Sequence, residues 1–286
     1  MRGDRSRGAR LPASHRRRVR SREPGSLAAM IRRLTLRDLD DAHGLSTAAG
    51  WNQTREDWLR ILRLDPEACF GYERDGRIVS TLSALRYGRD LAWIGMVLTD
   101  PVQRGRGFAR MLMEHALAWL DGLGVRRQRL DATTMGQPLY EACGFTAEYA
   151  VERWLREPRE APEAPRLPPA DARVLDDAAR FVLPDSESAA AGGGSYALTR
   201  PGRVARYFGP CRAASVLDAR RLVAWAVSRH GGGAMYWDLA PANEQAAALA
   251  REAGFLPVRT LLRMQRGGVA LAPDPCVFAF AGFEYG

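Results

Sequence analysis

The chain contains no lysine, so arginine supplies all 42 of its basic side chains, and this excludes lysine as a catalytic residue. Cysteine is also scarce. The four cysteines are scattered, without the spacing of a metal site or of a disulfide framework, which predicts no metal and a reducing, cytoplasmic setting: Cys69, Cys143, Cys211 and Cys276. No segment approaches the apolar length of a membrane span, so no membrane partner is expected.

The net charge of +9 is concentrated at the N-terminus. Residues 1–29 hold nine arginines against Asp4 and Glu23, so they carry +7 and the remainder only +2. With almost no apolar residues this extension is expected to be disordered, and it lacks the apolar run of a secretory signal, which argues against export. It is either an arginine arm for nucleic acid or a passive extension ahead of a domain that starts near Met30. We favour the passive extension, so nucleic acid is not an expected partner.

Local patterns then predict an antiparallel meander with flanking helices. Asp75-Gly76 lies between two strand-like runs and is a strong hairpin signal. Thr54, with Asp57 three residues later, is typical of a helix N-cap. The expected elements are a strand at 30–35, helices from about 38 and after 54, strands at 68–74, 77–87 and 91–98, and a helix after 105.

A glycine-punctuated turn joins the strand at 91–98 to the helix after 105. Asp100-Pro101 ends the strand, and Gly105 and Gly107 follow within Arg104-Gly105-Arg106-Gly107-Phe108-Ala109. Glycine lets the backbone adopt unusual φ and ψ values and lets an anion approach its N–H groups, while the first helical turn leaves unpaired donors there. Two arginines add positive charge. The turn suits a phosphate or pyrophosphate, although a plain structural turn is the alternative for a lone G-x-G.

A second motif lies downstream, where a strand at 129–134 precedes Tyr140-Glu141-Ala142-Cys143-Gly144-Phe145. The order of these elements and motifs resembles the acetyl-CoA-binding half of the GNAT superfamily of N-acetyltransferases. The order is a strand, Gln-Arg-Gly-Arg-Gly-Phe-Ala, a helix, a second strand and Tyr-x-x-x-Gly-Phe. The resemblance covers roughly residues 30–156. It implies a mixed, twisted sheet that splays open for the pantetheine arm, and acetyl-CoA held by the loop Arg104 to Ala109 and by the main chain of Met96, Val97 and Leu98.

The resemblance also implies roles for side chains. Tyr140 matches the tyrosine that protonates the departing thiolate, with packing against the cofactor as the alternative. Asp131, the acid of its strand, is a candidate base or orienting group, although a hydrogen bond to a nearby turn is the favoured role. Trp51 and Asn52 occupy a region that walls the acceptor site in the family. The alternative is that the tryptophan belongs to the core and the asparagine to a turn.

The second half of the sequence is a distant repeat of the first half. Gly144-Phe145 followed by Arg153-Trp154 recurs as Gly254-Phe255 followed by Arg263-Met264 at the same spacing, and an aspartate strand precedes each. This half resembles the C-terminal domain of a two-domain branch of these acetyltransferases, but a short segment at 183–195 departs from that branch and puts an inherited substrate in doubt. At the loop position it has Gly209-Pro210-Cys211, which loses the paired glycines and one N–H donor, so we expect no second cofactor. The final run, 276–286, is expected to be a last strand without evident chemistry.

The sequence thus predicts an α+β chain of two tandem GNAT-like domains, each a twisted, mostly antiparallel sheet flanked by helices. The predicted segments are a disordered extension at 1–29, a catalytic domain at 30–156, a proline-rich linker at 157–172 and a degenerate domain at 173–286. The predicted function is direct transfer of an acetyl group from acetyl-CoA to a primary amine of a small molecule or peptide. The alternatives are an acyl-CoA sensor or scaffold without turnover, and a nucleic-acid-associated factor acting through the arginine tail.

Overall fold

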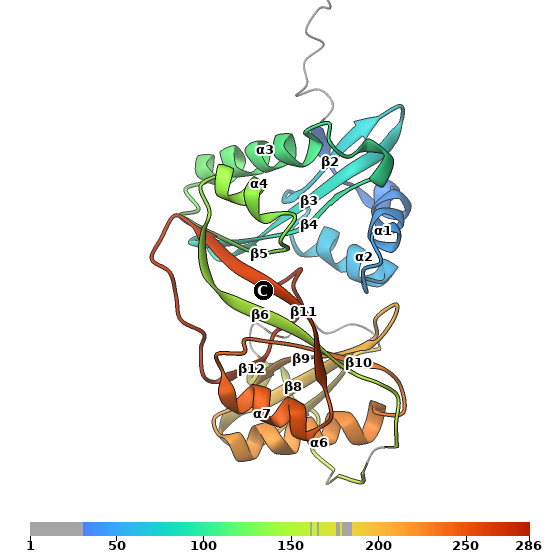
Figure 1. The fold of residues 1–286 in the computed structure, drawn as a ribbon, viewed down its shortest axis with the longest axis vertical. Coiled ribbons are helices and arrows are strands. Elements are labelled where there is room, and N and C mark those ends of the chain that lie inside the picture. The colour runs from blue at the N-terminus through green and yellow to red at the C-terminus, as the bar shows by residue number, and fades with distance from the viewer. Residues whose placement is uncertain (1–30, 161, 165, 176–177, 179–184) are drawn as a thin grey trace, which may run out of the picture.

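The computed structural model describes residues 31–160, 162–164, 166–175, 178 and 185–286, so the predicted disordered extension lies outside the described residues. The polypeptide forms two lobes that lie one above the other in Figure 1. Each lobe packs helices against its own part of one large sheet. Among the described residues no helix is long and apolar enough to cross a membrane.

The upper lobe contains the first half of the chain. Its strands are β1 (Ile31–Arg33), β2 (Cys69–Arg74), β3 (Arg77–Tyr87), β4 (Leu91–Thr99), β5 (Arg127–Ala132) and β6 (Thr146–Arg156). Its helices are η2 (Leu36–Asp38), α1 (Leu39–Ala48), α2 (Arg55–Leu64), η3 (Pro101–Gln103), α3 (Phe108–Gly122) and α4 (Gln137–Ala142).

Local chemistry accounts for these boundaries. Asp75 and Gly76 have φ of 52° and 75°, the left-handed pair that a tight hairpin between β2 and β3 requires. Thr54 and Asp57 form a complete capping box at the start of α2. Both signals were predicted from the sequence, and both are confirmed.

The lower lobe contains the second half. Its strands are β7 (Glu187–Ala190), β8 (Tyr196–Arg200), β9 (Arg206–Arg212), β10 (Met235–Leu239), β11 (Leu256–Arg266) and β12 (Val277–Ala279). Its helices are α5 (Ala172–Leu175), η5 (Gly192–Gly194), α6 (Val216–His230) and α7 (Glu244–Glu252). The described residues between Glu157 and Asp171 contain neither helix nor strand, as their proline content predicts.

One sheet runs through both lobes because the two halves exchange their long final strands. The strand order is β1-β2-β3-β4-β5-β11-β6-β10-β9-β8-β7, with β12 paired to β9. Strand β11 of the second half lies between β5 and β6, and β6 of the first half pairs with β10. Figure 1 shows these two strands crossing between the lobes. The proline linker therefore separates the halves in sequence, while the strands join them in space.

The repeat detected in the sequence places matching ion pairs across this exchange. Arg153 on β6 binds Asp238 on β10 through two hydrogen bonds of 2.7 and 2.6 Å. Arg263 on β11 binds Asp131 on β5 through two of 2.8 Å. All four side chains are at most 9% exposed. The equivalent residues of the repeat thus bind each half's last strand to the other half.

Strands β4 and β5 diverge, as the family resemblance implies. Their parallel pairing stops at Trp93 and Arg129, although both strands continue for several residues. In the second half, β9 and β10 likewise stop pairing at Phe208 and Trp237, but there β12 pairs with the rest of β9. Among the described residues, the first half therefore keeps this gap between its central strands free of a further strand, whereas the second half does not. The α+β prediction of two tandem, mostly antiparallel units with flanking helices is confirmed.

Candidate functional site

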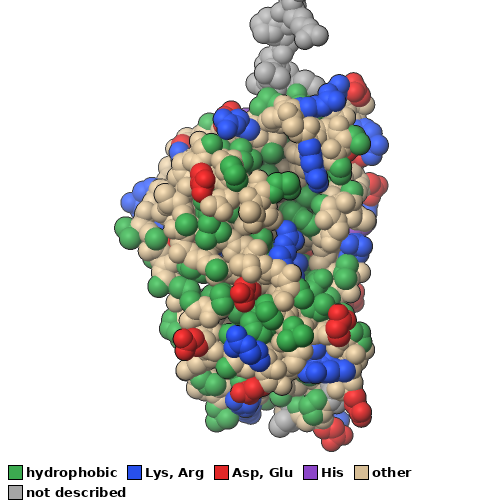
Figure 2. Space-filling model, in the orientation of Figure 1, with side chains coloured by type: hydrophobic (Ala, Val, Ile, Leu, Met, Phe, Trp, Pro, Cys, Tyr) green, Lys and Arg blue, Asp and Glu red, His purple; other side chains and the backbone are tan. Residues whose placement is uncertain are grey.

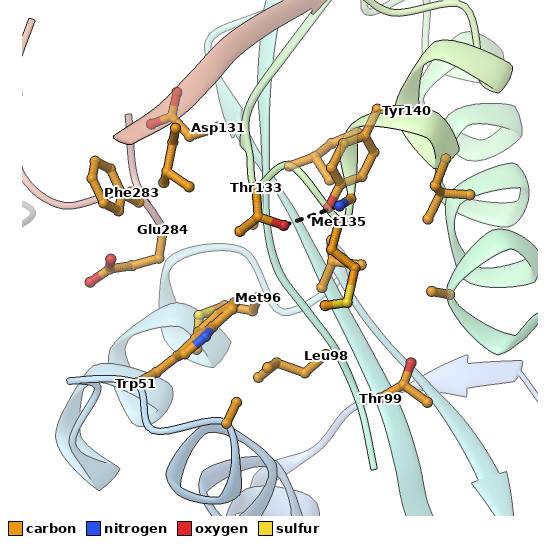
Figure 3. A pocket seen from close by; sticks show the side chains of 18 of the residues that line it. Trp51, Met96, Leu98, Thr99, Asp131, Thr133, Met135, Tyr140, Phe283 and Glu284 are labelled. Atoms are coloured by element: carbon orange, nitrogen blue, oxygen red, sulfur yellow. Dashed lines mark hydrogen bonds between the residues drawn. The ribbon is translucent and has the colours of Figure 1, made fainter. Parts of the chain in front are cut away.

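A cavity of about 620 Å³ opens where β4 and β5 diverge. It is lined mainly by β4, the loop before α3, the segment from β5 to α4 and the C-terminal residues Phe283 and Glu284, and most of its wall is apolar (Figure 3). Of the residues predicted from the sequence, the following line it: Trp51, Met96, Val97, Leu98, Arg104, Gly105, Ala109, Asp131 and Tyr140.

The loop before α3 has the backbone that the glycine pattern predicts. Gly105 and Gly107 have φ of 75° and 84°, and a Cβ on either would meet nothing within 4 Å. No side chain caps the N-terminus of α3, so its first N–H groups are available to an anion. Arg104 and Arg106 are exposed. Phe108, by contrast, is buried and stacks on Tyr72 at 4.1 Å, so only its main chain is available to a ligand.

Strand β4 is irregular at the residues predicted to hold the acyl arm. Met96 has φ of 51°, unusual for a residue with a side chain, and the β3 register shifts beside it. The Thr81 hydroxyl donates to the Met96 carbonyl at 2.8 Å, and the Ser80 hydroxyl donates to that of Leu98 at 2.6 Å. These bonds hold the irregular main chain in place beside the cavity.

Tyr140 extends from the short helix α4 into the cavity wall (Figure 3). A Cβ on Gly136 would lie 2.9 Å from the ring's Cε2 atom, so the absence of a side chain at 136 leaves room for the ring. Burial raises the pKa of the Tyr140 hydroxyl well above its usual value. The phenol, like any tyrosine, is protonated at neutral pH and has a proton to donate, and burial keeps it protonated to higher pH.

Asp131 also lines the cavity, but its carboxylate is occupied. Each of its oxygens accepts a 2.8 Å hydrogen bond from Arg263, and Asp238 makes the matching pair in the second half. Both oxygens of this carboxylate are thus engaged by one guanidinium. The contacts thus favour an orienting role for Asp131. Its hydrogen-bond partner is Arg263 on strand β11 of the other half, and not a nearby turn.

The structure places the side chains of Trp51 and Asn52 in different surroundings. Trp51 lines the cavity (Figure 3). Asn52 is 2% exposed, and its side chain bonds the main chain of Val204 and Ala205 at 2.6 to 3.0 Å. Its hydrogen bonds thus connect the two halves, and it is not among the residues that line the cavity. The sequence predicted that Asn52 contacts the substrate, but in the structure its side-chain amide is hydrogen-bonded to a segment more than 150 residues away.

The C-terminal segment, residues 280–286, supplies groups that the sequence did not indicate. It leaves β12 and enters between the lobes, where Figure 1 marks the C-terminus. Trp93 Nε1 donates to the carbonyl of Phe283 at 2.9 Å, and Phe283 and Glu284 line the cavity. The predicted last strand is therefore β12 alone, and the residues after it contact the first half. An acid between two aromatic residues was the only signal in the sequence.

A buried charge network lies behind this segment. Arg200, which is fully buried, donates to Asp57 at 2.8 Å and to Glu284 at 2.7 Å. Burial raises the pKa of Glu284, whereas Arg200 opposes the shift. In the described part of the chain, no three His, Cys, Asp or Glu side chains converge as a metal site requires.

The second half does not reproduce the anion site. Ser215 caps α6 by accepting from the N–H of Asp218, and the carboxylate of Asp218 lies in the first turn of that helix. A side-chain cap and a negative charge both oppose a bound pyrophosphate.

Comparisons with known proteins agree with this geometry. A model described as the acetyltransferase (GNAT) family matches residues 33–145, and one described as an acetyltransferase (GNAT) domain matches residues 172–275. YitH of Bacillus subtilis strain 168, an N-acetyltransferase described as uncharacterized, is 32% identical over 107 residues, which is 37% of this chain and 36% of that protein. The alignment thus spans about a third of that relative's length.

Two solved structures show the same two-lobed fold. A protein of Pyrococcus horikoshii described as a candidate acetyltransferase superposes with a TM-score of 0.78 at 19% identity, covering 90% of this chain and 95% of its own. A tandem GNAT protein from the clavulanic acid biosynthesis pathway superposes with a TM-score of 0.61 at 14% identity, covering 85% and 99%.

Proposed function

We propose that this chain, which belongs to the GNAT acetyltransferase family, transfers an acetyl group from acetyl-CoA to a primary amine of a small molecule or peptide. One observation carries the proposal. An uncapped helix N-terminus, preceded by two left-handed glycines, opens into the same cavity as the diverging strands and Tyr140.

The residues present fit acetyl-CoA. The open loop has room for a pyrophosphate beside Gly105 and Gly107, and Arg104 and Arg106 add positive charge. The main chain of Met96, Val97 and Leu98 lines the apolar part of the cavity, which suits a pantetheine arm. When bound, acetyl-CoA supplies an activated acyl thioester.

The chain's own residues then position the two reactants and supply a proton to the leaving group. The main chain of β4 and the α3 loop position the donor, and the lobes surround the acceptor. We assign to Tyr140 the proton that the departing thiolate needs, because its buried hydroxyl is protonated at neutral pH. Asp131 holds β11 in place beside the reacting groups. The amine attacks directly, without an acyl-enzyme intermediate.

The test is turnover against a panel of amines, with release of free thiol and the mass of the product as readouts. Acetylated product from at least one amine supports the proposal. Tight acetyl-CoA binding without product from any amine would favour a sensor or scaffold. Nucleic-acid action through the tail requires DNA binding that weakens with salt and disappears when residues 1–29 are deleted. Figure 2 shows both signs of charge scattered over one face, without a broad basic patch.

A further inference from the structure

The C-terminal segment brings the main chain of Glu284 to the strand that is proposed to hold the acyl group. A Cβ on Gly95 would lie 2.8 Å from the carbonyl oxygen of Glu284 and 3.3 Å from its Cα. Gly95 immediately precedes Met96, where β4 becomes irregular. The main chain of Glu284 is thus fixed against β4, and Glu284 is among the residues that line the cavity.

One oxygen of this carboxylate has no partner. Glu284 is 3% exposed; its Oε1 accepts from Arg200, whereas Oε2 is buried and makes no hydrogen bond with any described residue. Leaving a charged acceptor unpaired in a buried site costs free energy. A bound group that donates hydrogen bonds would remove this cost.

A second unpartnered acceptor lines the same cavity. Gln53 is 4% exposed, its Nε2 lies 3.4 Å from the Tyr207 hydroxyl, and its Oε1 is buried without a hydrogen bond among the described residues. Trp51 contributes an aromatic ring to the wall, and aromatic faces attract cations, whereas the ring of Phe283 already lies under the Arg153 guanidinium, whose carbon is 4.6 Å from the ring centroid. Two free acceptor oxygens and the Trp51 ring suit an ammonium group, which has three donors and a positive charge.

We infer that Glu284 and Gln53 form the acceptor subsite, which binds a primary ammonium group and in which Glu284 is the general base. The inference rests on the proposed acetyl transfer. The ammonium gives one proton to the carboxylate, and the free amine forms a bond to the carbonyl carbon. The carbon–sulfur bond breaks, Tyr140 protonates the thiolate, and the second proton lost by nitrogen restores Tyr140. Glu284 releases its proton to solvent.

The pH profile follows from the surroundings of Glu284. Burial is the largest influence on the pKa of Glu284 and raises it, and the nearby carboxylate of Asp57 raises it further. The guanidinium groups of Arg200 and Arg153 lower this pKa. Tyr207 and Tyr285 are the other titratable groups that face Glu284. A base with a raised pKa is protonated, and so inactive, below that pKa. We therefore expect kcat/KM of the wild type to rise with pH through the raised value, and Glu284→Gln to lose this rise.

The experiment compares the wild type, Glu284→Gln and the control Glu148→Gln. Glu148 is also a buried acid paired with an arginine, Arg129, but it does not line the cavity. The protein saturated with coenzyme A is titrated calorimetrically with spermidine, tyramine and lysine amide, and with tyrosol as the neutral counterpart of tyramine. At least one amine should bind the wild type and the control and bind Glu284→Gln at least about 10-fold more weakly, as expected for a lost charge-assisted hydrogen bond.

Equal binding to Glu284→Gln overturns the inference, as does the absence of amine binding to the wild type or equal binding of tyramine and tyrosol. Thiol release in the presence of acetyl-CoA reports separately on the proposed function. If no amine releases thiol but ammonium binding depends on Glu284, acetyl transfer fails and the subsite stands. If Glu284→Gln turns over with the wild-type pH profile, acetyl transfer stands and the assigned base is wrong.

Discussion

Among single residues, the proposed chemistry depends most on the Tyr140 hydroxyl. Tyr140→Phe removes the proton donor but keeps the ring. We expect kcat to fall by about 10² to 10⁴-fold, with little change in acetyl-CoA affinity. The defect should shrink with an acyl donor of more acidic thiol, because a better leaving group needs less protonation. Steady-state kinetics at saturating amine measure this, and full activity of the variant with acetyl-CoA would leave Tyr140 a packing residue.

Gly136 provides a second test of the same ring. An added methyl group in Gly136→Ala would lie 2.9 Å from the ring's Cε2 atom and must displace it. A misplacement of about 1 Å can cost on the order of 10²-fold in rate, so kcat should fall substantially while acetyl-CoA affinity is kept. Gly44→Ala is the control, because a Cβ there meets nothing within 4 Å. Equal kcat in the two variants would show that the position of the ring does not matter.

Among the elements, those whose signals are local were predictable from the sequence. The Asp75-Gly76 hairpin, the Thr54 cap and the glycine loop each depend on backbone preferences of neighbouring residues. Pairing between distant segments has no such local signal. The sequence showed the repeat of Arg153 and Arg263, but not that each arginine pairs with the other half. For the same reason it missed Glu284, which a chain path of nearly 190 residues brings to Gly95.

The N-terminus of α6 gives a prediction at this scale. Ser215→Ala removes the N-cap and should lower the free energy of unfolding by about 1 kcal/mol. Neither this change nor Arg212→Ala should alter acetyl-CoA affinity, because α6 has a side-chain cap and β12 fills the gap beside β9. Chemical denaturation and calorimetric titration check both statements. Two acetyl-CoA molecules bound per chain would contradict the assignment.

At the scale of the whole molecule, strand exchange should make the two lobes unfold together. Asp238→Ala leaves the buried Arg153 unpaired and should cost about 3 to 5 kcal/mol, the usual loss when one partner of a buried pair is removed. Asp90→Ala, which removes an exposed ion pair with Arg126, should cost much less. Scanning calorimetry should show one transition in every variant. Two separate transitions would mean that the exchanged strands do not couple the halves.

The central claim is that one acetyl-CoA binds each chain at the loop before α3. The Gly105→Val/Gly107→Val double variant places side chains where the pyrophosphate should lie, and Gly124→Val is its matched control. Gly124 also has positive φ, 72°, and no atom within 4 Å of a Cβ, but it lies beyond the opposite end of α3. Calorimetric titration with acetyl-CoA should give one site in the wild type and in Gly124→Val, and severely weakened binding in a double variant that circular dichroism shows to be folded. Unchanged affinity in that folded double variant would place the cofactor site elsewhere.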